Sequence, residues 1–185
     1  MNTEFFTALD LLEKENRLLP TVDAVHLGQG TYCFNSELPH ENVTKTTQVW
    51  GYLDSQETSG ISPEMYAEFI FPYYKKVAER YGLLSYGCCE AVDPIWDKCW
   101  STVPNLRRVS ISPWCNEEFM GEQMRGRKTV YHRKPSPNFL GVGDRMDEEA
   151  LRAHIKKTLL AAKGCTLEFT QRDVYYVSHS FEKVR

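Results

Sequence analysis

The sequence predicts an α/β protein built around a parallel sheet, and two observations lead to this prediction. From Gln48 onward the chain repeats one pattern, in which a short apolar strand is followed by a polar turn and a helix. Strands that alternate with helices are joined by right-handed crossovers and form a parallel sheet covered by helices. The 185 residues also suffice to bury one core. We therefore divide the chain into an N-terminal helix and irregular segment, 1–47, and a repeating βα region, 48–185.

Each expected element has a local signal. The strands are short runs, mostly apolar and bounded by polar or glycine-containing turns, and we expect them at 49–53, 83–88, 107–111, 128–132 and 165–169. The helix after the first strand begins at Pro63, with Ser62 as N-cap, and ends before Gly82. Pro72 lacks an N–H and should kink this helix. Its spacing predicts an inward stripe formed by Tyr66, Phe69, Tyr73 and Val77. Further helices are expected at 3–16, 94–102, 116–124 and 147–163.

The first 47 residues and the last few are less regular. Between the N-terminal helix and Gln48 lie about thirty residues rich in Gly, Thr, Pro and Asn, a length that is unusual for a loop in a compact domain. Gly28-Gln29-Gly30 marks a turn within it. The final residues, 180–185, look like the first turn of a helix. We expect from both ends that the chain is the C-terminal part of a longer barrel.

Composition narrows the class of partner. Lys and Arg number 22 against 25 Asp and Glu, for a net charge of −3, and no basic tract occurs. Nucleic acid and anionic membranes are therefore not expected as partners. We expect a small-molecule substrate instead. The first residues lack the pattern of a signal peptide, and no apolar run of about 18 residues exists. Cysteines without a disulfide-framework spacing, at 33, 88, 89, 99, 115 and 165, favour the reducing cytoplasm.

The strongest chemical signal is a pair of adjacent cysteines. Cys88 and Cys89 close the second expected strand and are followed by Glu90, at the strand end where α/β enzymes place their chemistry. Neighbouring Cα atoms lie about 3.8 Å apart, whereas disulfides prefer roughly 4.4 to 6.8 Å. We expect free thiols. The alternative is that one cysteine only packs as a small apolar side chain.

Four segments together resemble the uroporphyrinogen decarboxylase superfamily. They are ISPEMYAEFIFPYYKKVAERYG after LDSQE, the strand ending in YGCCE, RRVSISPW, and the strand leading into KPSP. The resemblance covers 48–185 and implies the C-terminal part of a (β/α)8 barrel, with about five βα units. The superfamily includes tetrapyrrole decarboxylases and zinc methyltransferases that exchange methyl groups between corrinoids and thiols. This chain looks most like the corrinoid-associated members that carry YGCCE.

The resemblance to the zinc methyltransferases implies a metal site at the cysteine pair. Those enzymes have a histidine, one intervening residue and a cysteine at the end of this strand. Tyr86 stands in the position of their histidine and Cys88 in that of their cysteine, so that the imidazole ligand is missing here. The expected zinc ligands are Cys88, Cys89, Glu90 and Glu168. Catalytic zinc takes three protein ligands and keeps an open position, where a substrate thiol loses its proton.

The remaining site predictions come from the ends of other strands. Asp54 and Ser55 match an aspartate and serine that face the cavity in the decarboxylases, whereas Thr170-Gln171-Arg172 stand where those enzymes have a histidine. We predict catalytic roles for Asp54, Glu57 and His132. We predict substrate contacts for Ser55, Gln56, Tyr86, Trp114 and Lys134. Solvation of Glu57 and Lys134, and a structural role for His132, are the competing interpretations.

Three functions stay open. The first is methyl transfer to a thiol, with zinc and with a corrinoid carried by a partner protein. The second is decarboxylation of a carboxylated, tetrapyrrole-like substrate, in which Asp54 polarises pyrrole N–H groups. The third is a non-catalytic fragment or binding module. Because half a barrel leaves sheet edges unpaired, we also expect the chain to bind a complementary N-terminal half or to self-associate.

Overall fold

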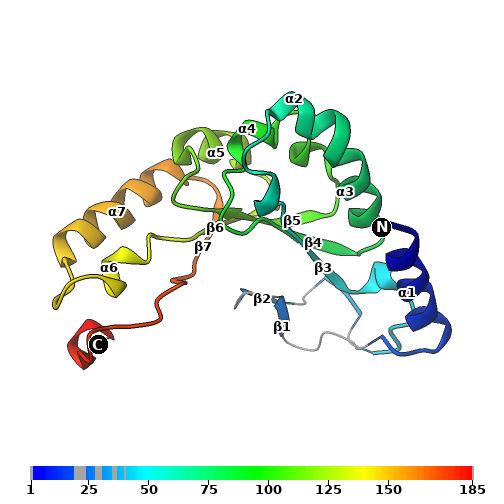
Figure 1. The fold of residues 1–185 in the computed structure, drawn as a ribbon, viewed down its shortest axis with the longest axis horizontal. Coiled ribbons are helices and arrows are strands. Elements are labelled where there is room, and N and C mark those ends of the chain that lie inside the picture. Colours follow the sequence, from blue (N-terminus) through cyan, green and yellow to red (C-terminus); the bar gives the residue numbers. More distant parts are fainter. Residues whose placement is uncertain (1, 19–23, 28–30, 35–36, 40, 185) are drawn as a thin grey trace. The chain divides into compact units, whose positions relative to one another are not determined.

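A computed structural model describes residues 2–18, 24–27, 31–34, 37–39 and 41–184 of the chain. They fall into two compact units: Met1–Tyr86 with Pro94–Arg107 form unit 1, and Gly87–Asp93 with Arg108–Arg185 form unit 2. Both units alternate strands and helices, with the elements labelled in Figure 1.

The predicted five-stranded sheet is present. Its order is β3-β4-β5-β6-β7, with bounds Trp50–Leu53, Leu83–Tyr86, Leu106–Ile111, Val130–Arg133 and Thr166–Phe169. The pairs β3 with β4, β5 with β6, and β6 with β7 are all parallel. Each strand lies within two residues of the expected position. The structure thus confirms an α/β fold with a parallel sheet.

Unit 1 contains an element that the sequence did not predict. After α1 (Asn2–Lys14), the segment expected to be irregular holds an antiparallel hairpin, formed by β1 (Ala24–Leu27) and β2 (Thr31–Phe34). The predicted turn at 28–30 lies outside the described residues. Short 3-10 turns flank β3, at Thr46–Gln48 and Gln56–Thr58.

The helix after β3 shows why its predicted inward stripe was wrong. It consists of α2 (Pro63–Met65), a π-helical turn η3 (Tyr66–Ile70) and α3 (Phe71–Ala78), with the Ser62 hydroxyl capping its start. The π turn ends two residues before Pro72, which cannot donate an N–H, and it adds one residue to the helical turn. The next buried side chain after Tyr66 is therefore Phe71, five residues on, and Ala78 follows, whereas Phe69 and Tyr73 are exposed.

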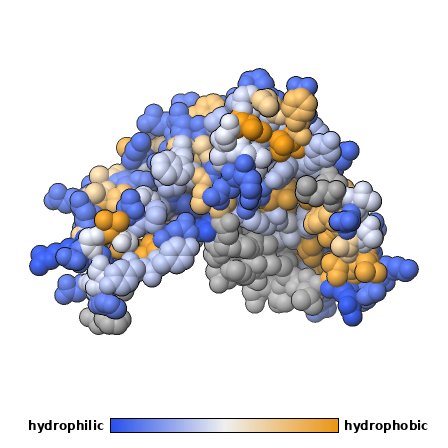
Figure 2. Space-filling model, in the orientation of Figure 1, coloured by the Kyte–Doolittle hydropathy of each residue, from blue (hydrophilic) through white to orange (hydrophobic). Residues whose placement is uncertain are grey.

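The other predicted helix of unit 1 is shorter than expected. The range 94–102 contains α4 (Asp93–Trp96) and a separate 3-10 turn, η4 (Trp100–Thr102). Trp96 and Trp100 are fully buried there. Elsewhere in unit 1, apolar side chains remain exposed on α1 and around α2, among them Leu11 and Met65 (Figure 2).

In unit 2 the helices follow their predicted ranges closely. Helix α5 (Glu117–Met124) is capped by the Asn116 side chain, and α7 (Glu148–Ala161) by the Asp147 side chain. A short helix α6 (Asn138–Gly141) follows β6, and a 3-10 turn η5 (Phe181–Val184) stands where the sequence predicted a first helical turn. Helices α5 and α7 lie on the same side of β6 and β7 (Figure 1).

That side of the sheet is closed by a buried ion pair. The Arg133 guanidinium donates to the Glu117 carboxylate at 2.9 Å, and the Thr158 hydroxyl donates to the other carboxylate oxygen at 2.6 Å. Tyr131 on the same face of β6 donates to the Glu117 carbonyl. Because Glu117 belongs to α5 and Thr158 to α7, these contacts fix both helices to the strand. No helix in the described part of the chain is long and apolar enough to cross a membrane.

Candidate functional site

The face of β5, β6 and β7 that lies opposite to α5 and α7 carries a row of polar side chains, arranged in layers along the strands. Successive side chains of a strand point to opposite faces, so residues two apart share a face. The register pairs Arg108 with Val130, Ser110 with His132, and His132 with Glu168. Arg108, Ser110, His132 and Glu168 therefore lie on one face, away from the Arg133 and Tyr131 side chains that meet α5. A buried parallel sheet is normally apolar, so this polar face suggests a site.

The first layer of the row is a closed ion pair. Arg108 is almost fully buried and donates two hydrogen bonds to the Glu168 carboxylate, at 2.7 and 2.8 Å. This bidentate arrangement is the strong form of an arginine–carboxylate contact. Glu168 is therefore committed to Arg108 in the structure.

The next layer holds a neutral histidine. The His132 Nε2 lies 2.7 Å from the Thr170 hydroxyl. Burial, together with the charges of Arg108, Lys134 and Arg172, lowers the pKa of His132 to about 2. The imidazole is consequently uncharged at neutral pH, where it can exchange a hydrogen bond with Thr170 without adding positive charge.

At the carboxyl end of the strands, three hydrogen bonds hold the backbone of Cys88. Its N–H donates to the Glu90 carboxylate at 2.9 Å, while its carbonyl accepts from the Ser110 hydroxyl at 2.7 Å and from the Lys134 ammonium at 3.1 Å. Gly87, which leads into this segment, has a φ of +96°, and a Cβ there would lie 3.0 Å from the Ser110 Cβ. Only glycine meets both conditions comfortably.

The two thiols are not joined by a disulfide and lie against each other. The Cys88 and Cys89 sulfurs are 3.4 Å apart, with Cys88 buried and Cys89 partly exposed. The Arg172 Nη1 lies 3.9 Å from the Cys88 sulfur. Burial, together with the hydrogen bond with Cys88, raises the pKa of Cys89 to about 11. The expectation of unbridged cysteines is met in this structure.

Lys134 is the chemically most unusual group of the site. It is only 4% exposed, it follows β6, and burial lowers its pKa to about 8, with the neighbouring Arg172 charge as a further cause. Among the described residues its ammonium forms no ion pair, and its single hydrogen bond goes to the Cys88 carbonyl. A lysine with such a pKa exchanges protons near neutral pH, as a general base must.

The predicted zinc ligands do not assemble into a donor set in the described residues. No group of three or more His, Cys, Asp and Glu side chains there is placed to hold a metal ion. Glu168 is held by Arg108, and the Glu90 carboxylate accepts the Cys88 N–H. Only the two thiols remain close together, and cationic Lys134 and Arg172 flank them. As arranged, these side chains do not fit a three-ligand zinc site.

The residues predicted at the end of β3 belong to unit 1. The Asp54 carboxylate accepts from the Tyr52 hydroxyl at 2.8 Å, and the Asp54 carbonyl accepts from the Tyr74 hydroxyl at 2.8 Å. Gln56 and Glu57 lie in the 3-10 turn that follows, where neither is buried. Asp54 is thus a positioned carboxylate, whereas the side chains of Gln56 and Glu57 form no hydrogen bond or ion pair within the part of the chain that the structure describes.

Two further residues with predicted substrate contacts, Ser55 and Tyr86, are both buried in unit 1. The Tyr86 hydroxyl contacts the Ser55 hydroxyl and lies 3.3 Å from that of Tyr66. Its ring stacks on Trp100 with the centroids 3.5 Å apart, and the Trp100 indole N–H donates to the Tyr66 hydroxyl. These groups form a buried aromatic network whose polar atoms satisfy one another.

Trp114 lies in unit 2, after β5, and its side chain is 76% exposed. Its backbone N–H donates to Ser112, whose hydroxyl also lies 3.6 Å from the Cys115 sulfur. The Cys115 thiol is buried, and burial raises its pKa. The turn that carries Trp114 is therefore anchored by its neighbours, while the indole itself faces solvent.

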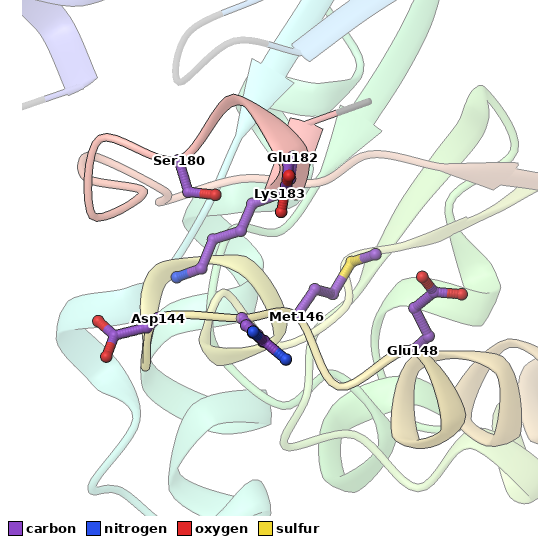
Figure 3. A pocket seen from close by; sticks show the side chains of 7 residues that line it. Asp144, Met146, Glu148, Ser180, Glu182 and Lys183 are labelled. Atoms are coloured by element: carbon purple, nitrogen blue, oxygen red, sulfur yellow. The ribbon is translucent and has the colours of Figure 1, made fainter.

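A polar hollow in unit 2 contains none of the predicted site residues (Figure 3). Its lining combines acidic and basic side chains from the segment before α7 and from the last turn, namely Asp144, Arg145, Met146, Glu148, Ser180, Glu182 and Lys183. The Lys183 ammonium donates to the Leu140 and Gly143 carbonyls. These bonds tie the last turn to the end of α6, which is a structural role.

Sequence reasoning missed three members of the site: Arg108, Ser110 and Arg172. The signal for the first two was the alternation of Arg108, Ser110 and Ser112 in a strand expected to be buried on both faces. For Arg172 the signal was the continuation of the Thr166, Glu168, Thr170 alternation beyond β7. Comparisons of the chain with family models, with curated proteins and with solved structures found no match.

Proposed function

We propose that the chain is a member of the uroporphyrinogen decarboxylase superfamily that transfers a methyl group to a small thiol carrying a carboxylate. The observation that carries the proposal is the buried Lys134 amine beside Arg172 and the cysteine pair, at the carboxyl ends of parallel strands. Active sites of (β/α)8 barrels lie at this end of the strands. The helices on one face and the polar row on the other favour a barrel-like arrangement in unit 2, with the row facing the lumen.

The two cations take different roles in this proposal. Arg172 binds the substrate carboxylate, because guanidinium stays charged and offers paired donors. Lys134 accepts the thiol proton, because its lowered pKa of about 8 leaves part of the amine neutral near pH 8. The substrate sulfur then attacks the methyl carbon, a sulfur–carbon bond forms, and the bond to the donor breaks with its electron pair on the donor.

In this assignment a lysine takes the place of zinc and activates the substrate thiol by accepting its proton. In the superfamily's zinc enzymes the metal acidifies the substrate thiol, whereas here Lys134 would remove the proton. The methyl donor would be a corrinoid on a partner protein or another small donor. The complementary half of the barrel, as a separate chain, is a second proposed partner.

A methyl-transfer assay tests the proposal. The chain is incubated with methylcobalamin and either mercaptoacetate or 2-mercaptoethanol, and the thioether products are measured by mass spectrometry. We expect faster methylation of mercaptoacetate, a roughly hundredfold loss with Lys134→Met, and loss of the preference for mercaptoacetate with Arg172→Gln. Lys128→Met, which changes an exposed lysine, is the matched control and should leave the rate unchanged. No acceleration over the protein-free reaction, or full activity of Lys134→Met, would refute it.

Decarboxylation of a tetrapyrrole-like substrate is the second candidate, and one observation favours it. Asp54 ends β3 as in the decarboxylases, and its carboxylate and carbonyl are held by Tyr52 and Tyr74. A fixed carboxylate of this kind would polarise pyrrole N–H groups. Release of carbon dioxide from uroporphyrinogen, abolished by Asp54→Asn, would favour this function over methyl transfer.

A further inference from the structure

The geometry of the Cys88–Cys89 pair in unit 2 supports an inference that does not depend on the proposed methyl transfer. Its sulfurs lie 3.4 Å apart, far beyond the disulfide bond length of about 2.05 Å. Closing a disulfide between adjacent residues would require the intervening peptide to rotate. That peptide is held at the Cys88 carbonyl by Ser110 and Lys134, and the preceding N–H is held by Glu90. The hydrogen bonds therefore keep the pair open as a dithiol.

An open dithiol with fixed spacing suits a single atom that bonds to both sulfurs. Two bonds of about 2.3 Å, the length of a zinc–thiolate bond, that meet at about 95° span roughly 3.4 Å, whereas a tetrahedral angle of about 109° would need roughly 3.8 Å. The observed spacing thus matches a pyramidal trivalent centre more closely than a tetrahedral metal ion.

The charged groups around the pair balance one another. Arg172 lies 3.9 Å from the Cys88 sulfur and pairs with Asp173 at 3.4 Å, while the Lys134 ammonium and the Glu90 carboxylate both bond to the Cys88 backbone. Such surroundings suit a neutral adduct, in which both thiol protons have been lost and the central atom carries no net charge.

We propose that Cys88 and Cys89 form a bidentate site for monosubstituted trivalent arsenicals. The reaction is a condensation without change of oxidation state: R–As=O and two thiols give one cyclic R–As(S)₂ adduct and one water. Two arsenic–sulfur bonds form, the arsenic–oxygen double bond breaks, and both thiol protons leave with the oxygen. Partly exposed Cys89 is the point of entry, and buried Cys88 closes the ring.

Phenylarsine oxide is the probe, and intact-protein mass spectrometry is the readout. The wild-type chain should form a one-to-one adduct that excess dithiothreitol removes and excess 2-mercaptoethanol does not, because the second bond is intramolecular. Cys89→Ser and Cys88→Ser should each weaken binding by roughly a hundredfold or more. Cys165→Ser and Cys33→Ser are the controls and should bind like the wild type.

Several results would overturn the proposal. They are the absence of an adduct with the wild-type chain, an adduct that 2-mercaptoethanol removes, undiminished binding by Cys89→Ser, and loss of binding in either control variant. Cys89 is not fully buried, so its serine variant keeps the test open if Cys88→Ser fails to fold. The assay needs no methyl donor, so its failure would leave the methyl-transfer proposal untouched.

Discussion

The face of β6 that packs on α5 and α7 carries charge differently from the face that carries the polar row. On the helix-covered face, Arg133 meets Glu117, and Thr158 occupies the second carboxylate oxygen. On the other face, the charges run from the bidentate Arg108–Glu168 pair to Lys134, which has no ion-pair partner among the described residues. Strand β6 thus carries a structural pair on one side and is followed, on the other side, by a buried cation that forms no ion pair among the described residues.

The difference shows which buried charge indicates function. A buried pair whose partners satisfy each other positions helices, and evolution can keep it for folding alone. A buried lysine that donates only to a carbonyl costs stability through desolvation and gains no ion pair in return. Such a cost is typical of a site prepared for a ligand or a proton. Three measurements test this contrast.

The largest expected effect concerns the helix-covered face. Glu117→Ala should lower the free energy of unfolding by about 3–5 kcal/mol, because it leaves the Arg133 charge buried without its partner. Arg133 is 3% exposed, and its Nε already has no hydrogen-bond partner among the described residues. Urea denaturation measures the change. Glu118→Ala, at the exposed neighbouring position, should shift the value by less than about 0.5 kcal/mol.

An effect below about 1 kcal/mol for Glu117→Ala would mean that Arg133 finds water or another partner. The ion pair would then contribute little, and the contrast between the two faces would be lost.

The second test concerns Lys134. Its pKa in the folded chain is lowered to about 8 from the usual value of 10.5, so the unfolded chain binds more protons between these two values. Stability contributed by this residue therefore rises as the pH rises from 8 to 10.5, by about 2–3 kcal/mol. Comparing wild type with Lys134→Met at each pH cancels the titration of other groups. A difference that stays constant across this range would place the Lys134 ammonium in water.

Much of the fold was predictable because its signals are local. Ser62 and Pro63 mark the start of a helix by capping chemistry, and Asn116 and Asp147, the first residues of two predicted helices, are the N-caps of α5 and α7. The hairpin at Ala24–Leu27 and Thr31–Phe34 was missed because its two four-residue strands lie in a segment rich in loop-forming residues. The π turn was missed because Pro72 indicates a break in helical hydrogen bonding but not how the chain accommodates it.

The site was predictable only in part, because partners depend on strand register. The sequence correctly indicated that Cys88 and Cys89 form no disulfide with each other, since covalent geometry decides this locally. It offered Glu168 as a zinc ligand, since nothing local shows that Arg108, sixty residues earlier, holds the carboxylate. From the sequence, Arg172 was only one of three residues that stand where the decarboxylases have a histidine. Its contact with Cys88 depends on the path of the chain after β7, which the sequence does not show.

The smallest expected effect concerns His132, which lies between the closed ion pair and Lys134 on the polar face. Burial and the neighbouring positive charges lower its pKa to about 2 in the folded chain, from the usual value of 6.5, so the unfolded chain takes up a proton on acidification and the folded chain does not. Stability should therefore fall as the pH drops below 6.5. Relative to His132→Gln, the wild type should lose about 2 kcal/mol between pH 7 and pH 5.

Glutamine keeps a hydrogen-bonding group for Thr170 and removes only the titration, and His179→Gln, at an exposed position, should reproduce the wild-type pH dependence. Parallel curves for wild type and His132→Gln would show that the folded chain accepts this proton. In that case the charges near His132 would balance one another, and the polar row would be a structural network like the one beneath α5 and α7.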